Sequence, residues 1–221
     1  MFGVVLLVVL LIGAVGWLLG WSSFLTVKQI EVVGVAADSP IKSDAIISLS
    51  GVRIGEPMAR LSGASVKREL AQIPRIKSVS LIRHWPHRIV LLIKERVPVA
   101  AIVKGNQFLL IDSESKAYAT VSVLPVEVPT IMVTGDFQTG INTAMSVITH
   151  LPFNIRSQLT HVDSSGKDGV QLILRSGTRI IWGSNEDLAL KSRVLTTLLA
   201  GAGASKVKTF DVSAPFAPTT E

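Results

Sequence analysis

The first 27 residues carry no charged side chain, and residues 2–25 are almost entirely aliphatic or aromatic. As a helix, these 24 residues would rise about 36 Å, which exceeds the ~30 Å hydrocarbon thickness of a bilayer. A cleaved signal peptide would need a basic segment ahead of a shorter apolar core, whereas the first basic side chain here is Lys28. The sequence therefore predicts an uncleaved transmembrane helix that anchors the chain through residues 1–26.

Charge is divided unevenly over the rest of the chain. Residues 28–104 hold 13 Lys and Arg against 6 Asp and Glu, a net +7, whereas residues 105–221 hold 9 against 10, a net −1. A basic segment next to an anchor is typical of proteins attracted to anionic membrane lipids or to an acidic partner, but an ordinary solvated surface has the same composition. Nucleic acid is disfavoured as a partner, because there is no basic run with interleaved aromatics. With no cysteine, disulfides and thiolate sites are excluded.

The sequence after the anchor, residues 27–97, predicts three strands and two helices. Residues 27–34 read as a strand, and Ser43 opens a short helix that ends at Gly51. A second helix over residues 65–72 stops before Pro74. Residues 76–82 and 88–95 alternate as two further strands. The predicted order is β-α-α-β-β, a small domain over residues 27–97.

The segment between the last two strands contains a pair of histidines. His84 and His87 have the H-x-x-H spacing, which presents two metal ligands on one face only when the segment is helical. Pro86 opposes a helix there, and no acidic ligand lies nearby in sequence. We therefore interpret the segment as the turn of a β-hairpin and expect no metal.

The remaining residues read as a second domain, a mixed β-sheet with two helices over residues 98–214. Pro98 marks its start because proline interrupts strand pairing. Several short strands follow, and the helices are predicted over residues 143–150 and 185–201. A last strand is expected at residues 207–212, ahead of a short proline-containing tail, residues 215–221. The whole chain is thus assigned to the α+β class, with the anchor in front.

Motifs of enzymatic chemistry are missing from the sequence. There is no glycine-rich phosphate loop and no G-x-S-x-G elbow. His150 and His161 are isolated, and Lys191 and Ser192 are adjacent helix residues whose side chains point apart. We expect no catalytic residue, no metal, no cofactor and no small-molecule substrate.

Several segments together resemble the FtsQ/DivIB family of bacterial cell-division proteins. They are "VKQIEVVG", "GEPM", "IPRIKSVSLIRHWPHRIVLLIKERVPVA", "LLIDSESKAYA" and the later "GVQLILRSGTRIIWG" with "FDVSAP". The resemblance implies a membrane-proximal POTRA module and a following β domain outside the cytoplasm, with the N-terminus cytoplasmic. The family's motif positions fall on Arg83, Trp85, Pro86, Glu95, Arg96 and Pro98, which the resemblance marks as architectural residues of the hairpin and the domain junction.

The same resemblance implies a non-enzymatic scaffold at the division septum. Its partners would be bitopic proteins of the FtsB and FtsL type and the machinery of septal peptidoglycan synthesis. In the family, a partner segment adds to the exposed edge of the second domain near the terminal strand. The corresponding residues here are Val207, Lys208, Thr209, Phe210, Asp211 and Val212, with Lys191 and Arg193 on the preceding helix. The alternative is that this strand only closes the core, since a sequence does not reveal which strand is the edge.

Two features depart from the family pattern. The sequence lacks the usual charged cytoplasmic tail. Pro215 and Pro218 would shorten the last strand, so that a partner would pair differently or elsewhere. A rival function is a membrane-anchored POTRA chaperone or secretion component that captures extended polypeptides in the envelope. Localisation at the septum would separate the two, because a secretion factor should spread around the cell.

Overall fold

The computed structural model describes residues 2–21 and 25–221, which divide between Arg96 and Val97 into two compact units. The N-terminal segment contains the helix α1, Phe2–Trp21. Among the described residues, no helix is found with the length and apolarity that a bilayer crossing requires. Residues 22–24, which belong to the predicted anchor, lie outside the described residues. The transmembrane anchor therefore stays a prediction.

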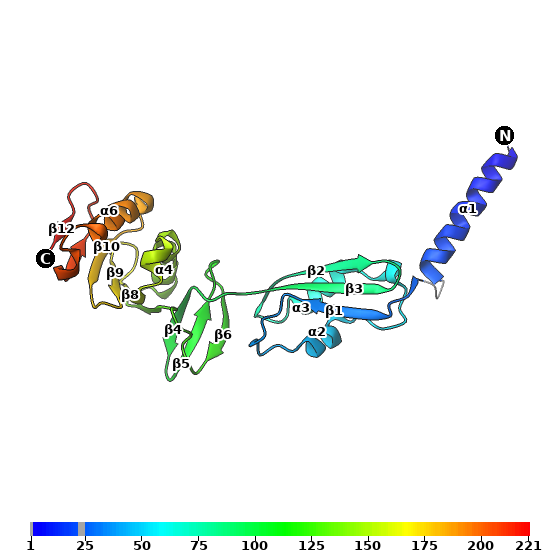
Figure 1. The fold of residues 1–221 in the computed structure, drawn as a ribbon, viewed down its shortest axis with the longest axis horizontal. Coiled ribbons are helices and arrows are strands. Elements are labelled where there is room, and N and C mark those ends of the chain that lie inside the picture. The colour runs from blue at the N-terminus through cyan, green and yellow to red at the C-terminus, as the bar shows by residue number, and fades with distance from the viewer. Residues whose placement is uncertain (1, 22–24) are drawn as a thin grey trace. The chain divides into compact units, whose positions relative to one another are not determined.

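The first unit has the predicted β-α-α-β-β order (Figure 1). Its strands are β1 (Gln29–Val33), β2 (Ile76–His84) and β3 (Arg88–Glu95), and its helices are α2 (Ser43–Ser50) and α3 (Gly63–Leu70), with the 3₁₀ turn η2 (Met58–Arg60) between them. The sheet has the order β1-β3-β2. β1 runs parallel to β3, whereas β2 and β3 form the antiparallel hairpin expected from the sequence.

Alternating side chains of the sheet build the core of this unit. Ile89, Leu91 and Ile93 of β3 are buried on the face covered by α2 and α3, where they pack in one cluster with Ile46 and Leu70. Gly51 ends α2 in the left-handed conformation that the sequence suggested. Helix α3 starts two residues earlier than predicted, because the Ser62 side chain accepts a hydrogen bond from the Ser65 backbone and caps it.

The second unit is one nine-stranded mixed sheet. Its order is β12-β11-β10-β9-β8-β7-β4-β5-β6, so β12 and β6 are the edges. The strands are β4 (Ala100–Lys104), β5 (Gln107–Ile111), β6 (Ala117–Val121), β7 (Thr130–Val133), β8 (Leu159–Ser164), β9 (Val170–Leu174), β10 (Arg179–Gly183), β11 (Thr209–Asp211) and β12 (Thr219–Thr220).

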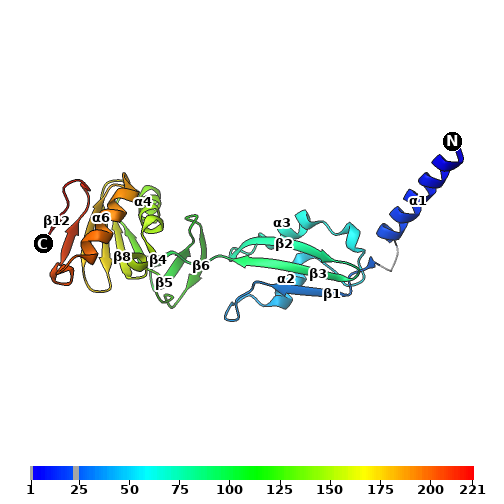
Figure 2. The ribbon, with the colours of Figure 1, turned by 45° about the horizontal axis from the view of Figure 1, so that its top comes forward.

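Two long helices cover one face of this sheet (Figure 2). They are α4 (Phe137–His150) and α6 (Leu188–Ala200), and the short α5 (Phe153–Arg156) and the 3₁₀ turn η3 (Ala204–Lys206) follow them in the chain. α4 is longer than the predicted 143–150 because Asp136 caps it, with its carboxylate accepting from the Thr139 backbone. Hydrogen bonds from the Thr139 side chain and, second, from the Thr139 backbone lower the pKa of Asp136. Trp182, Leu195 and Phe210 are buried in the resulting core.

Candidate functional site

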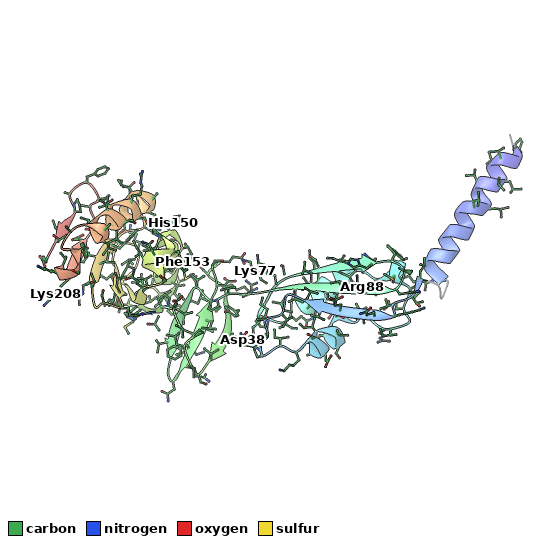
Figure 3. All side chains as sticks on the ribbon, viewed as in Figure 1. Asp38, Lys77, Arg88, His150, Phe153 and Lys208 are labelled. Carbon is green, nitrogen blue, oxygen red and sulfur yellow. The ribbon has the colours of Figure 1, made fainter. Side chains whose placement is uncertain are left out.

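Most of the residues expected to bind a partner lie in or directly beside β11 of the second unit. Within β11, Phe210 is 1% exposed and lies in the core together with Val212, whereas Thr209 and Asp211 are half-buried. Val207 packs against the same core. Lys208 is exposed at the margin of the unit (Figure 3). The alternation leaves few side chains of this segment available to a partner.

The free edge expected along residues 207–212 is not free. β11 pairs with β10 on one side, and on the other side Phe210 and Asp211 are in register with Thr220 and Thr219 of β12. The Thr209 backbone exchanges hydrogen bonds with Glu221, at 2.9 Å from its N–H and 3.0 Å to its carbonyl. The predicted tail, residues 215–221, therefore contains β12, the edge strand of the sheet.

Prolines explain this difference. β11 already ends at Asp211, and Pro215 and Pro218 bracket the turn that follows, in which the Ala217 N–H donates to the Ala214 carbonyl at 3.0 Å. The turn returns the chain alongside β11. The signal missed in the sequence was the Thr219-Thr220 pair directly after this turn, since threonine favours strands.

Lys191 cannot serve as a partner contact, because its side chain is only 1% exposed. Its Nζ donates to the carbonyls of Trp182 (3.1 Å) and Ser184 (2.9 Å), and to the Ser184 hydroxyl at 3.4 Å. These contacts join α6 to the chain that leaves β10. Burial lowers the pKa of Lys191, and the nearby carboxylates of Asp187, Glu186 and Asp211 partly oppose that shift.

Arg193, in contrast, is exposed on the outer face of α6. It lines a groove of about 450 Å³ whose other walls are Thr197 and apolar side chains of α6, together with Pro218 of the C-terminal segment. Phe216, in the turn before β12, is 86% exposed. The candidate partner site is thus the edge formed by Thr219 and Thr220 together with the groove of Arg193 and Pro218; we call it the β12 edge site.

We expect Lys191→Met to lower the unfolding free energy around α6 by about 1–3 kcal/mol at neutral pH, since two buried carbonyls lose their donor. The pKa of Lys191 is lower in the folded chain than its unfolded value of 10.5. At a pH between these two values, the unfolded chain therefore binds more protons than the folded chain. The free energy of unfolding of the wild type therefore rises with pH through this window. Lys191→Met lacks this rise, so the difference in stability between the two proteins should widen. Hydrogen exchange of α6 and β10 peptides at neutral and alkaline pH measures this. If this difference in stability instead becomes smaller as the pH rises, the folded state favours the charged form of Lys191.

Three of the architectural residues, Arg83, Glu95 and Arg96, form hydrogen bonds that join separate segments of the first unit. The Arg83 guanidinium donates to the carbonyls of Met58, at 3.0 Å, and Leu61, which ties the hairpin to η2. Glu95 accepts from the Ala36 backbone and the Ser39 hydroxyl, both at 2.9 Å. The Arg96 guanidinium donates to the Pro74 carbonyl at 3.1 Å. These contacts are consistent with the architectural role that the sequence suggested, which stays a proposal.

The other three architectural positions are exposed or half-buried. Trp85 and Pro86 form the exposed turn between β2 and β3, joined by a cis peptide bond. Pro98 lies in the connection between β3 and β4, immediately before Val99, whose N–H donates to the Ile111 carbonyl at 2.8 Å. The structure therefore places Trp85 where a second molecule or surface can reach it.

His161 is isolated in the sequence, but in the structure it contacts two polar side chains. Its Nδ1 lies 2.7 Å from the Thr130 hydroxyl and its Nε2 lies 2.9 Å from the Asp163 carboxylate. Hydroxyl, imidazole and carboxylate in this order occur in hydrolases, but Thr130 and His161 are direct register partners on β7 and β8. We interpret the chain of contacts as a cross-strand interaction that supports the sheet. Within the described ranges, no group of three or more metal-ligating side chains is found.

Comparisons with known proteins match both units. The model described as "POTRA domain, FtsQ-type" matches residues 25–96, and the model described as "Cell division protein FtsQ/DivIB, C-terminal" matches residues 100–213. "Cell division protein FtsQ" of Streptomyces bingchenggensis is 34% identical over 219 residues, which cover 95% of this chain and 81% of the relative. The protein of the same name from Streptomyces venezuelae is 32% identical over 223 residues, covering 96% and 80%.

Proposed function

The chain belongs to the FtsQ/DivIB family of cell-division proteins, and from this membership we propose that it is a non-enzymatic scaffold of the division machinery. It holds bitopic partners of the FtsB and FtsL type and links them to septal peptidoglycan synthesis. The residues that we assign to partner capture are those of the β12 edge site rather than the side chains of β11.

The observation that carries this proposal is the outer edge of β12. In the described part of the chain, β12 pairs with β11 alone and is the last strand of the sheet. Glu221 uses its backbone N–H and carbonyl toward β11. Because these groups alternate in direction along an antiparallel strand, the backbone of Thr220 points outward. An extended partner segment can add to this edge by main-chain hydrogen bonds.

The groove beside the strand supplies a second contact. It is lined by Pro218 and by residues of α6: Leu190, Arg193, Val194, Thr197 and Leu198. A partner that continues past its added strand would place apolar side chains there and an acidic one beside Arg193. Side-chain contacts of this kind give selectivity, which backbone pairing alone cannot give.

We also propose that residues 1–26 anchor the scaffold in the cell membrane, with the N-terminus cytoplasmic and the units at residues 27–97 and 98–214 outside. The support is α1, whose 20 residues have no acidic side chain in the first turn and no basic one in the last. Tethering partners in one membrane raises their effective concentration, so that individually weak contacts suffice for assembly. Localisation of a fluorescent fusion at the septum, rather than around the envelope, would separate this scaffold from a POTRA chaperone.

The substitution Thr220→Pro tests the assigned edge. Proline removes the outward backbone donor of Thr220 but keeps the inward groups of Glu221. We expect partner affinity to fall by roughly fivefold, the equivalent of about 1 kcal/mol for one hydrogen bond. Affinity for an FtsB-like partner reconstituted in the same bilayers measures the effect, with Thr220→Ala as the control that keeps the donor. If both variants bind like the wild type, the partner site is not at β12.

A further inference from the structure

At one end of the POTRA-like sheet, two loops are hydrogen-bonded to Val27 and Lys28, the residues that lead into β1. The Lys28 N–H donates to the His87 carbonyl at 2.8 Å, which fixes the β2–β3 turn beside the incoming chain. The Gly55 N–H donates to the Val27 carbonyl at 2.8 Å, and the Val27 N–H donates to the Glu56 carbonyl at 2.9 Å. The hairpin turn and the loop before η2 therefore flank the same short segment.

Apolar and basic side chains project from these two loops. Trp85 is 50% exposed and Ile54 is 63% exposed. Lys28, Arg53 and Arg88 are exposed beside them. The nearby carboxylates are Glu31, which lies 3.4 Å from Arg88, and the half-buried Glu56. We call Lys28, Arg53, Ile54, Trp85 and Arg88 the hairpin-tip patch.

We propose that the hairpin-tip patch lies on the surface of a bilayer that contains anionic phospholipid. This inference rests on the membrane anchor of the proposed function, because the anchor determines which surface is within reach. Lys28 follows the last residue of α1, Trp21, by seven positions. Even a fully extended chain of that length spans only about 25 Å.

The chemistry of the patch fits the interfacial layer of a membrane. An indole ring with one polar N–H favours the region between headgroups and acyl chains, and Ile54 adds an apolar side chain beside it. Lys and Arg at the same level are attracted to anionic headgroups while their stems cover apolar surface. Trp85 is the only tryptophan of residues 25–96, all of which the structure describes. Arg88 lies toward the patch, whereas Asp38 and Lys77 lie at the opposite end of the unit (Figure 3).

A lipid surface is favoured over a protein partner because the patch combines an exposed indole with exposed basic side chains, which suits anionic headgroups, and because the anchor would keep that surface within reach. A contact too weak to hold a free molecule becomes populated when both sides are tethered. The docked patch would fix the tilt of the POTRA-like unit against the membrane and so restrict where partners meet it.

The absence of cysteine allows the docking to be measured with one reporter at a time in the full chain. His84→Cys places a fluorophore next to Trp85, and Asp38→Cys places the matched reporter at the opposite end of the sheet; both positions are exposed. Each labelled chain is reconstituted into phosphatidylcholine nanodiscs with and without phosphatidylglycerol. Lipids spin-labelled near the headgroup then quench any fluorophore that touches the interface.

We expect quenching at position 84 to exceed that at position 38 severalfold and to increase with phosphatidylglycerol. Adding Ile54→Ser and Trp85→Ser should reduce it to the level at position 38, whereas Val33→Ser, an exposed apolar site at the other end of β1, should leave it unchanged. Equal quenching at both positions would overturn docking. Docking would also be overturned if the fluorophore at position 84 is not quenched while Ile54→Ser and Trp85→Ser weaken partner capture. The patch would then bind protein and not lipid. Failure of the chain to enter nanodiscs would instead refute the anchor.

Discussion

Replacing Gly34 by alanine is expected to lower the free energy of unfolding of the first unit by about 2–6 kcal/mol. Gly34 directly follows β1 and has a φ of +90°, a conformation that costs any residue with a Cβ. An added Cβ would also overlap the backbone carbonyl of Ile93 in β3. Neither the carbonyl nor its strand can move away without breaking the sheet, so the two costs add.

Gly51 provides the matched control for this prediction. It has a similar φ of +72°, but a Cβ there meets no atom within 4 Å. Gly51→Ala should therefore cost only the conformational term, about 1–2 kcal/mol. Hydrogen exchange of β1 and β3 peptides measures both variants. If the two substitutions cost the same, the close approach of Gly34 to β3 does not exist and the register of β1 is wrong.

The sequence predicted local structure well where hydrophobic periodicity was strong. Alternation over residues 88–95 identified β3, because its buried side chains Ile89, Leu91 and Ile93 occur at every second position. The turn at Trp85 and Pro86 followed from the two strands around it. The α+β class and the β-α-α-β-β order of the first unit are confirmed on this basis.

Predictions about exposure failed where they depended on distant backbone groups. The family resemblance placed Lys191 among the residues expected to contact a partner. The structure buries it because the carbonyls of Trp182 and Ser184 lie next to a register irregularity between β9 and β10 at Ile181 and Gly183. No local pattern around Lys191 encodes those acceptors. In the same way, the identity of the edge strand depends on the return of β12 to β11, which requires knowledge of the whole sheet.

Phe210→Ala is expected to cost about 3–5 kcal/mol, the usual range for a large aromatic side chain removed from a core. Phe210 is 1% exposed and packs with Trp182 and Leu195 in the main cluster of the second unit. β11 has only three residues, and it connects β12 to the rest of the sheet. Loss of its one large anchor should therefore open β11 and β12 before the remaining strands.

Phe216→Ala is the matched control for Phe210→Ala, because it removes an exposed phenylalanine and not a buried one. Its side chain is 86% exposed, so its removal should change stability by no more than about 0.5 kcal/mol. Hydrogen exchange should show faster exchange in β11 and β12 for Phe210→Ala alone, together with weaker partner capture because the edge has dissolved. If Phe210→Ala frees β12 yet partner affinity is unchanged, partners do not use this edge. If affinity rises instead, β12 competes with the partner for β11, and the binding strand is the one that the sequence first indicated.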